Sequence, residues 1–162
     1  MTHAVAVNII LVEDDDGHAV LVEKNLRRAG LKNGFLRLRD GQEALDYFFG
    51  PPTADAGKLA STVILLDINM PRVDGVEVLA RLKQHEETHA IPVVVLTTTD
   101  DPREIERCYE LGCNVYITKP VEYDAFIEAV KRLGLFLQVV KLPPANENAG
   151  LSRAGMPGKE LR

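Results

Sequence analysis

The stretch LLDINMPRVDG, residues 65–75, decides how this chain folds, because an apolar run ends there abruptly on the carboxylate of Asp67. The run is apolar without alternation, which is typical of a short strand buried on both faces of a parallel sheet. Pro71 cannot continue that strand, and Asp74 with Glu77 forms a capping box that starts a helix. Asp67 is therefore predicted at the carboxyl end of a central strand, where open α/β sheets place their sites.

Composition limits the class of protein. The chain has 162 residues, of which 46% are hydrophobic, and this fits one domain with an appendage. A net charge of −5 and 19 dispersed lysines and arginines argue against a nucleic-acid-binding surface. No apolar stretch approaches the roughly 20 residues of a membrane helix, and the first residues do not begin a signal peptide. We expect a cytoplasmic protein.

Apolar runs of strand length alternate with helical patterns along the chain. The expected strands are 5–12, 35–38, 63–66, 91–96 and 115–117, the expected helices are 16–30, 40–50, 75–86, 101–112 and 122–137, and a surface loop is expected over 51–61. Parallel neighbours need helical crossovers, and these crossovers are right-handed. The pattern therefore predicts an α/β domain with a doubly wound, five-stranded parallel sheet and five helices.

The carboxyl-terminal part of the chain carries more apolar surface than one helix face can bury. Beyond Leu133 the apolar residues are Leu135, Phe136, Val139, Val140 and Leu142. Such a surface usually meets a partner, although it could instead cover its own domain. We expect a domain over 5–137 and an extension over 138–162, in which an apolar arm to about 142 forms a homodimer interface and the polar remainder is a mobile tail.

Polar side chains follow the expected strands at their carboxyl ends, and these ends meet at one edge of a parallel sheet. They are Glu13, Asp14, Asp67, Thr97 and Lys119. Three carboxylates at such an edge repel one another by roughly 4 kcal/mol per pair at 4 Å and an effective dielectric constant near 20. A divalent cation relieves this repulsion, and ligands that are all oxygen favour magnesium over zinc.

This set of side chains is suited to phosphoryl transfer. A carboxylate beside a metal is a competent nucleophile toward a phosphoryl group, so Asp67 is expected to form an aspartyl phosphate. Lys119 would supply a positive charge for the phosphoryl oxygens, and the Thr97 hydroxyl would donate a hydrogen bond to one of them. The set holds no strong general base for hydrolysis. We therefore expect the product to persist as a signal and to be removed only slowly.

With these residues the chain resembles the receiver domain of two-component response regulators over about residues 7–137. The motifs that carry the resemblance are ILVEDD at 10–15, LDINMP at 66–71, Thr97, and Lys119-Pro120. Thr97 follows Asp67 by thirty residues and Lys119 follows Thr97 by twenty-two, as the family pattern expects. The resemblance implies a flavodoxin-like strand order, 2-1-3-4-5.

The resemblance also implies individual roles. Asp67 would be the phosphoacceptor, Asp14 and Glu13 would bind Mg2+ directly and through water, and the backbone carbonyl of Asn69 would be a further ligand. Thr97 and Tyr116 would be the switch pair, in which the hydroxyl moves toward the phosphoryl group and the aromatic ring follows inward. The peptide bond Lys119-Pro120 would be cis, as the family has it there.

The chain is similar to single-domain regulators of bacterial and cyanobacterial phytochrome kinases, several of which pair through their carboxyl-terminal segments. No DNA-binding domain follows the matched region, so we expect a stand-alone signalling or phosphorelay protein. Its partner would be a sensor histidine kinase, with a bacteriophytochrome as a candidate. It would not be an enzyme beyond magnesium-dependent self-phosphorylation from a phosphodonor and slow autodephosphorylation.

Two other functions remain open from the residues alone. A magnesium-dependent phosphatase would use the same aspartyl intermediate, but such enzymes typically carry a second carboxylate two residues after the nucleophile, where this chain has Asn69. A scaffold that acts without phosphorylation would be expected to lose part of the set, and none of it is missing. Both observations favour a phosphorylation switch.

Overall fold

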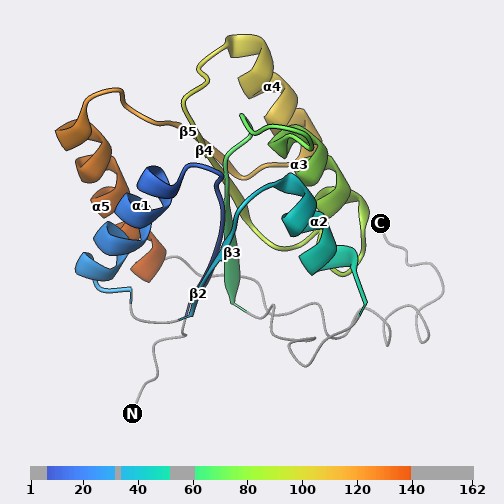
Figure 1. The fold of residues 1–162 in the computed structure, drawn as a ribbon, viewed down its shortest axis with the longest axis horizontal. Coiled ribbons are helices and arrows are strands. Elements are labelled where there is room, and N and C mark those ends of the chain that lie inside the picture. Colours follow the sequence, from blue (N-terminus) through green and yellow to red (C-terminus); the bar gives the residue numbers. More distant parts are fainter. Residues whose placement is uncertain (1–6, 32–33, 52–60, 140–162) are drawn as a thin grey trace.

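Within residues 7–31, 34–51 and 61–139, which the computed structural model describes, five parallel strands form one sheet that five helices cover (Figure 1). In chain order the elements are β1 (Asn8–Val12), α1 (Asp16–Arg28), β2 (Phe35–Leu38), α2 (Gly41–Phe49), β3 (Thr62–Leu66), α3 (Gly75–Gln84), β4 (Val93–Thr97), α4 (Pro102–Leu111), β5 (Val115–Thr118) and α5 (Tyr123–Val139). The strand order β2-β1-β3-β4-β5 confirms the expected doubly wound sheet.

Small differences from the expected boundaries have local causes. β4 begins at Val93 rather than residue 91, because Pro92 has no N–H to donate to a neighbouring strand. α5 continues past the expected end at Leu137 to Val139. Most of the expected loop over 51–61 and the polar tail lie outside the described residues.

The sheet separates two hydrophobic half-cores, because alternate residues of each strand point to opposite faces. Ile9 and Leu11 of β1 pack with α1 and α5 on one face. Ile10 and Val12 pack with α2, α3 and α4 on the other. Figure 1 shows the same division, with α1 and α5 together on the left and the other helices on the right. The middle strands β3 and β4 are buried along their whole length, as their unbroken apolar sequences predict.

The corner between β3 and α3 fixes the backbone beside Asp67. The Asp67 N–H donates to the Val12 carbonyl at 3.0 Å, and the Gly75 N–H donates to the Ile68 carbonyl at 3.1 Å. A Cβ atom on Gly75 would lie 2.3 Å from the Asp67 carbonyl oxygen, so only glycine allows the helix to start this close to the strand. The Asp74 carboxylate then caps α3 by accepting the Glu77 N–H at 3.0 Å.

Candidate functional site

Three carboxylates gather where β1 and β3 end. One carboxylate oxygen from each of Glu13, Asp14 and Asp67 lies within 4.8 Å of the others. Glu13 and Asp67 are buried, whereas Asp14 is exposed to solvent. The neighbouring strands hold them there, because the Glu13 N–H donates to the Leu38 carbonyl at 3.0 Å. The acids expected at this edge of the sheet are thus brought together.

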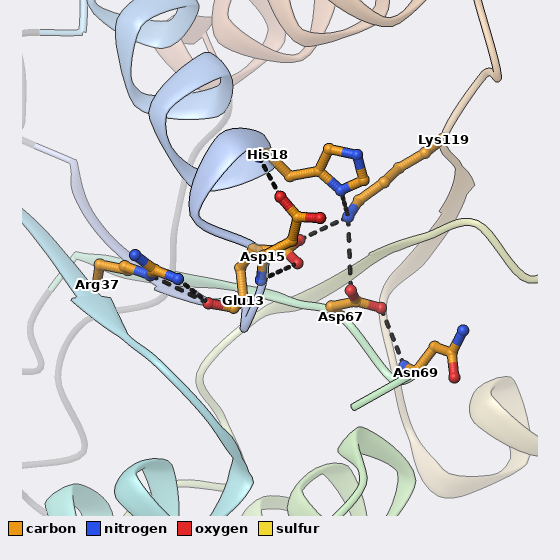
Figure 2. Close-up of polar contacts among 7 residues, drawn as sticks. All are labelled: Glu13, Asp15, His18, Arg37, Asp67, Asn69 and Lys119. Atoms are coloured by element: carbon orange, nitrogen blue, oxygen red, sulfur yellow. Dashed lines mark hydrogen bonds and ion pairs between the residues drawn. The ribbon is translucent and has the colours of Figure 1, made fainter. Parts of the chain in front are cut away.

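Lys119 contacts two of these carboxylates and is 3% exposed (Figure 2). Its Nζ atom is 2.5 Å from Oε1 of Glu13 and 3.5 Å from Oδ2 of Asp67. The Lys119 backbone N–H also donates to the Thr97 carbonyl at 2.6 Å, which ties the loop after β5 to the end of β4. The site holds three carboxylates and this one ammonium, so it keeps an excess of negative charge when all four groups are ionised.

The crowding of negative charge affects the protonation of Glu13. Its burial, together with the charge of Asp67, raises the pKa of Glu13 from 4.5 to about 7, although the hydrogen bond and charge of Lys119 oppose the rise. Its other oxygen, Oε2, accepts the Asp15 N–H at 3.1 Å. A buried acid that holds its proton near neutral pH is a site where a cation would readily compete with that proton.

This pKa predicts how the stability of the metal-free protein depends on pH. Between pH 4.5 and about 7 the folded state keeps a proton on Glu13 that the unfolded chain has released. The free energy of unfolding should therefore fall as the pH rises through this window, by on the order of 1–3 kcal/mol in total. Urea unfolding in EDTA at several pH values measures the effect, and Glu13→Gln should lack this component. If the free energy of unfolding depended on pH in the same way in the wild type and in Glu13→Gln, the prediction would be contradicted.

Thr97 and Tyr116, the two residues expected to form the switch pair, differ in their hydrogen bonding. The Thr97 hydroxyl is fully buried at the end of β4 and has no hydrogen-bond partner among the described residues. A buried polar group without a partner calls for a ligand or another explanation. The half-buried Tyr116 donates its hydroxyl to the Thr99 carbonyl at 2.6 Å, and burial raises the pKa of Tyr116 to about 12.

Two residues that the sequence analysis did not single out complete the site. The Nδ1 atom of His18 lies 3.0 Å from the Lys119 Nζ atom. The Arg37 guanidinium on β2 donates to the Glu13 carbonyl at 2.8 and 3.0 Å (Figure 2). It also pairs with Asp16 at 2.7 Å. His18 lies in the first turn of α1, directly after the acidic loop, and this position in the sequence could have indicated its proximity to that loop.

The carboxylate cluster fits a divalent cation that prefers oxygen. Its donors are carboxylate oxygens at mutual distances that one cation can bridge, and the cluster holds no thiolate. Asn69, whose carbonyl was expected as a further ligand, is exposed beside the cluster, and its N–H donates to Oδ1 of Asp67 at 3.0 Å. This hydrogen bond holds the Asp67 carboxylate in place.

One expectation is wrong. No cis peptide bond occurs among the described residues, so Lys119-Pro120 is trans. The trans form is the ordinary preference of such a bond, by about 0.5–1 kcal/mol.

The model of the response regulator receiver domain matches residues 9–131 of this chain. Response regulator Rcp1 from Synechocystis is 36% identical over 138 residues, which are 85% of this chain and 93% of that protein. Its Mn2+-bound crystal structure has a TM-score of 0.73 at 34% identity, covering 85% of this chain and 99% of that one.

Two other solved structures are similar over most of the chain. A response regulator receiver domain from Rhodospirillum rubrum has a TM-score of 0.78 at 48% identity and covers 86% of this chain and 99% of its own. The phosphorylated cyanobacterial phytochrome response regulator RcpA has a TM-score of 0.76 at 34% identity, covering 85% of this chain and 98% of its own. These likenesses agree with the fold.

Proposed function

Since this chain belongs to the response regulator receiver domain family, whose function is to accept a phosphoryl group, we propose that Asp67 is its phosphoacceptor. The observation that carries this proposal is the meeting of three carboxylates and one buried ammonium at the carboxyl edge of the sheet. Asp67 is the central acid of this group, since it follows the middle strand β3 and faces Lys119.

Glu13, Asp14 and Asp67 would hold Mg2+, with the Asn69 carbonyl as a further ligand. When bound, the cation would neutralise charge on the phosphoryl oxygens and on the acids around them. Receiver domains bind Mg2+ or Mn2+ at this acidic site, as the Mn2+-bound form of Rcp1 illustrates.

The transfer step uses this chain's own groups. A carboxylate oxygen of Asp67 attacks the phosphorus atom, the bond between phosphorus and the donor breaks, and the donor leaves with the electron pair, as the acetate anion when acetyl phosphate is used. The Lys119 ammonium stabilises one phosphoryl oxygen, and the unpartnered Thr97 hydroxyl donates to another. Movement of Thr97 leaves room for the Tyr116 ring to turn inward, so that the two residues form the switch pair.

The Thr97 hydroxyl gives a prediction that separates this role from a structural one. Thr97→Ala removes a buried hydroxyl that has no partner among the described residues, so the free energy of unfolding in EDTA should change by less than about 1 kcal/mol. The rate of phosphorylation by acetyl phosphate should fall about tenfold. Thr97→Ser keeps the hydroxyl and should stay close to the wild-type rate. Equal rates for the alanine and serine variants would exclude the proposed hydrogen bond.

The proposal is tested by incubating the protein with Mg2+ and acetyl phosphate and following its intact mass. We expect a single phosphoryl adduct that is labile to hydroxylamine and does not form in EDTA. Rapid release of phosphate without an adduct would instead support a phosphatase, and no reaction would support a scaffold. Asn69 favours the adduct, because its side chain cannot act as the second acid that phosphatase turnover requires.

Receiver domains interact with histidine kinases, and we propose a sensor kinase of the phytochrome class as the phosphodonor. The likeness to RcpA over 85% of this chain supports this choice. The described residues contain no helix long and apolar enough to cross a membrane.

We also propose that the chain forms a homodimer through α5 and the extension that follows it. Leu135, Phe136 and Val139 expose apolar side chains at helical neighbour spacing near the end of α5. The receiver domain would span 5–137, and the extension would begin within α5 at residue 138. Val140, Leu142 and the tail lie outside the described residues.

Phe136→Asp tests the dimer, because it places a charge in the middle of this apolar surface. The variant should weaken self-association at least tenfold, since a buried unpaired carboxylate costs more than the lost ring contact. Light scattering over a range of concentrations gives the solution mass. Lys131→Asp, at an exposed position one turn earlier, should leave the mass unchanged. A wild-type protein that is monomeric at all concentrations would rule out the interface.

A further inference from the structure

The buried ammonium of Lys119 has a third contact, with the ring of His18. Lys119 Nζ lies 2.5 Å from Glu13, 3.5 Å from Asp67 and 3.0 Å from Nδ1 of His18 (Figure 2). The His18 ring stands in the first turn of α1, and its centroid is 5.5 Å from that of Phe126 on α5. The three contacts match the three N–H groups of an ammonium.

The direction of this hydrogen bond follows from the donor inventory. A lysine ammonium has three N–H groups and no lone pair, so it can only donate. Nδ1 of His18 must therefore accept, which requires a neutral ring with its proton on Nε2. The backbone of His18 is also fixed, because its N–H donates to Oδ1 of Asp15 at 2.9 Å.

The contact between His18 and Lys119 is important because the other two partners of Lys119 also take part directly in the proposed reaction. Glu13 and Asp67 would bind the cation, and Asp67 would also receive the phosphoryl group. Each of these events draws a carboxylate oxygen away from Lys119 or changes its charge. Of the three groups that contact the ammonium, only His18 neither binds the cation nor receives the phosphoryl group in the proposed reaction.

We propose that His18 is a positioning residue for phosphoryl acceptance. By accepting a hydrogen bond at Nδ1, it keeps the Lys119 ammonium beside Asp67 while Glu13 is engaged with the cation. This proposal rests on the proposed function. It adds to the reaction a group that touches neither the phosphoryl group nor the cation and acts through Lys119 alone.

Two variants separate the effect of the aromatic ring of His18 from the effect of its hydrogen-bond acceptor, Nδ1. His18→Phe keeps an aromatic ring against Phe126 but removes the acceptor. His18→Asn removes the ring but places Oδ1 the same two bonds from Cβ as Nδ1. His18→Phe should slow phosphorylation by acetyl phosphate about tenfold, and His18→Asn should stay within about twofold of the wild type. Calorimetric Mg2+ titration should give similar affinities for all three proteins.

The outcomes have distinct meanings. A wild-type rate in His18→Phe would overturn the proposal. So would an equally slow His18→Asn, because that result would assign the effect to packing against Phe126. A wild-type protein that takes up no phosphoryl group would instead contradict the proposed function itself.

A second measurement needs no phosphorylation and begins with the wild-type protein. Nitrogen-15 NMR of the imidazole should show an unprotonated Nδ1 and a protonated Nε2 for His18, and the Nδ1 signal should shift in Lys119→Met. A proton on Nδ1, or no shift in that variant, would overturn the hydrogen bond on which the proposal depends.

Discussion

Asp67→Asn should take up no phosphoryl group from acetyl phosphate, and in EDTA it should be more stable than the wild type. The amide is not a competent nucleophile, so the adduct disappears entirely. The amide also removes one negative charge from the crowded cluster, which should raise the free energy of unfolding by on the order of 1–2 kcal/mol. The asparagine Oδ1 can still accept the Asn69 N–H, so the local backbone should be preserved.

Intact mass and urea unfolding with and without Mg2+ measure both effects. Mg2+ should stabilise the wild type and have much less effect on Asp67→Asn. Asp74→Asn is a matched control, because it makes the same change seven residues later at an exposed helix cap that asparagine also serves. That control should keep the adduct. An adduct of wild-type yield in Asp67→Asn would place the phosphoacceptor elsewhere.

Lys119→Met should have the opposite effect on stability. Lys119 and Glu13 are 3% and 1% exposed, and removing one partner of a buried pair costs about 3–5 kcal/mol. The loss should be larger above pH 7, where Glu13 releases its proton, than at pH 5, where a neutral Glu13 needs no counter-charge. Phosphorylation should also slow by about 10²–10³-fold, because the group that stabilises the phosphoryl oxygens is gone.

Urea unfolding in EDTA tests whether Lys119→Met loses stability because the buried Glu13 carboxylate is left without a counter-charge. Adding Glu13→Gln to Lys119→Met should restore most of the lost stability but none of the phosphorylation rate. Lys131→Met, at an exposed lysine on α5, should change neither quantity. If Lys119→Met were as stable as the wild type at pH 8, Lys119 would not be the group that stabilises the ionised carboxylate of Glu13.

The sequence predicts the fold and the meeting of the acids because both follow from local patterns. The unbroken apolar strands, the capping residues Asp40, Asp74 and Asp101, and the glycine after α4 determine where elements start and stop. Once the strands are parallel and in order, the residues after β1, β3, β4 and β5 must converge. The convergence of Glu13, Asp67 and Lys119 therefore needs no knowledge of side-chain conformation.

The contacts of His18 and Arg37 could not be predicted in the same way. His18 reaches Lys119 across 101 positions, and whether a helical histidine points to solvent or to a neighbouring strand depends on how α1 packs on the sheet. Arg37 alternates with apolar neighbours on β2, which predicts a solvent-facing side chain rather than a clamp on the Glu13 carbonyl. Tertiary packing, rather than periodicity, determines both contacts.

The sheet divides the interior into two half-cores, and this division affects how phosphorylation and the proposed self-association can influence each other. Tyr116 packs in the half-core of α2, α3 and α4, whereas α5, which carries the proposed dimer surface, packs in the other. A coupling free energy between phosphorylation and self-association must be the same in both directions. Because the fully buried strands β3 and β4 lie between the half-cores, we expect the movement of Tyr116 to contribute little to that coupling. The contact of His18 with both Lys119 and Phe126 of α5 is the shorter path by which phosphorylation would strengthen or weaken the proposed dimer, and dimerisation would change phosphorylation by the same free energy.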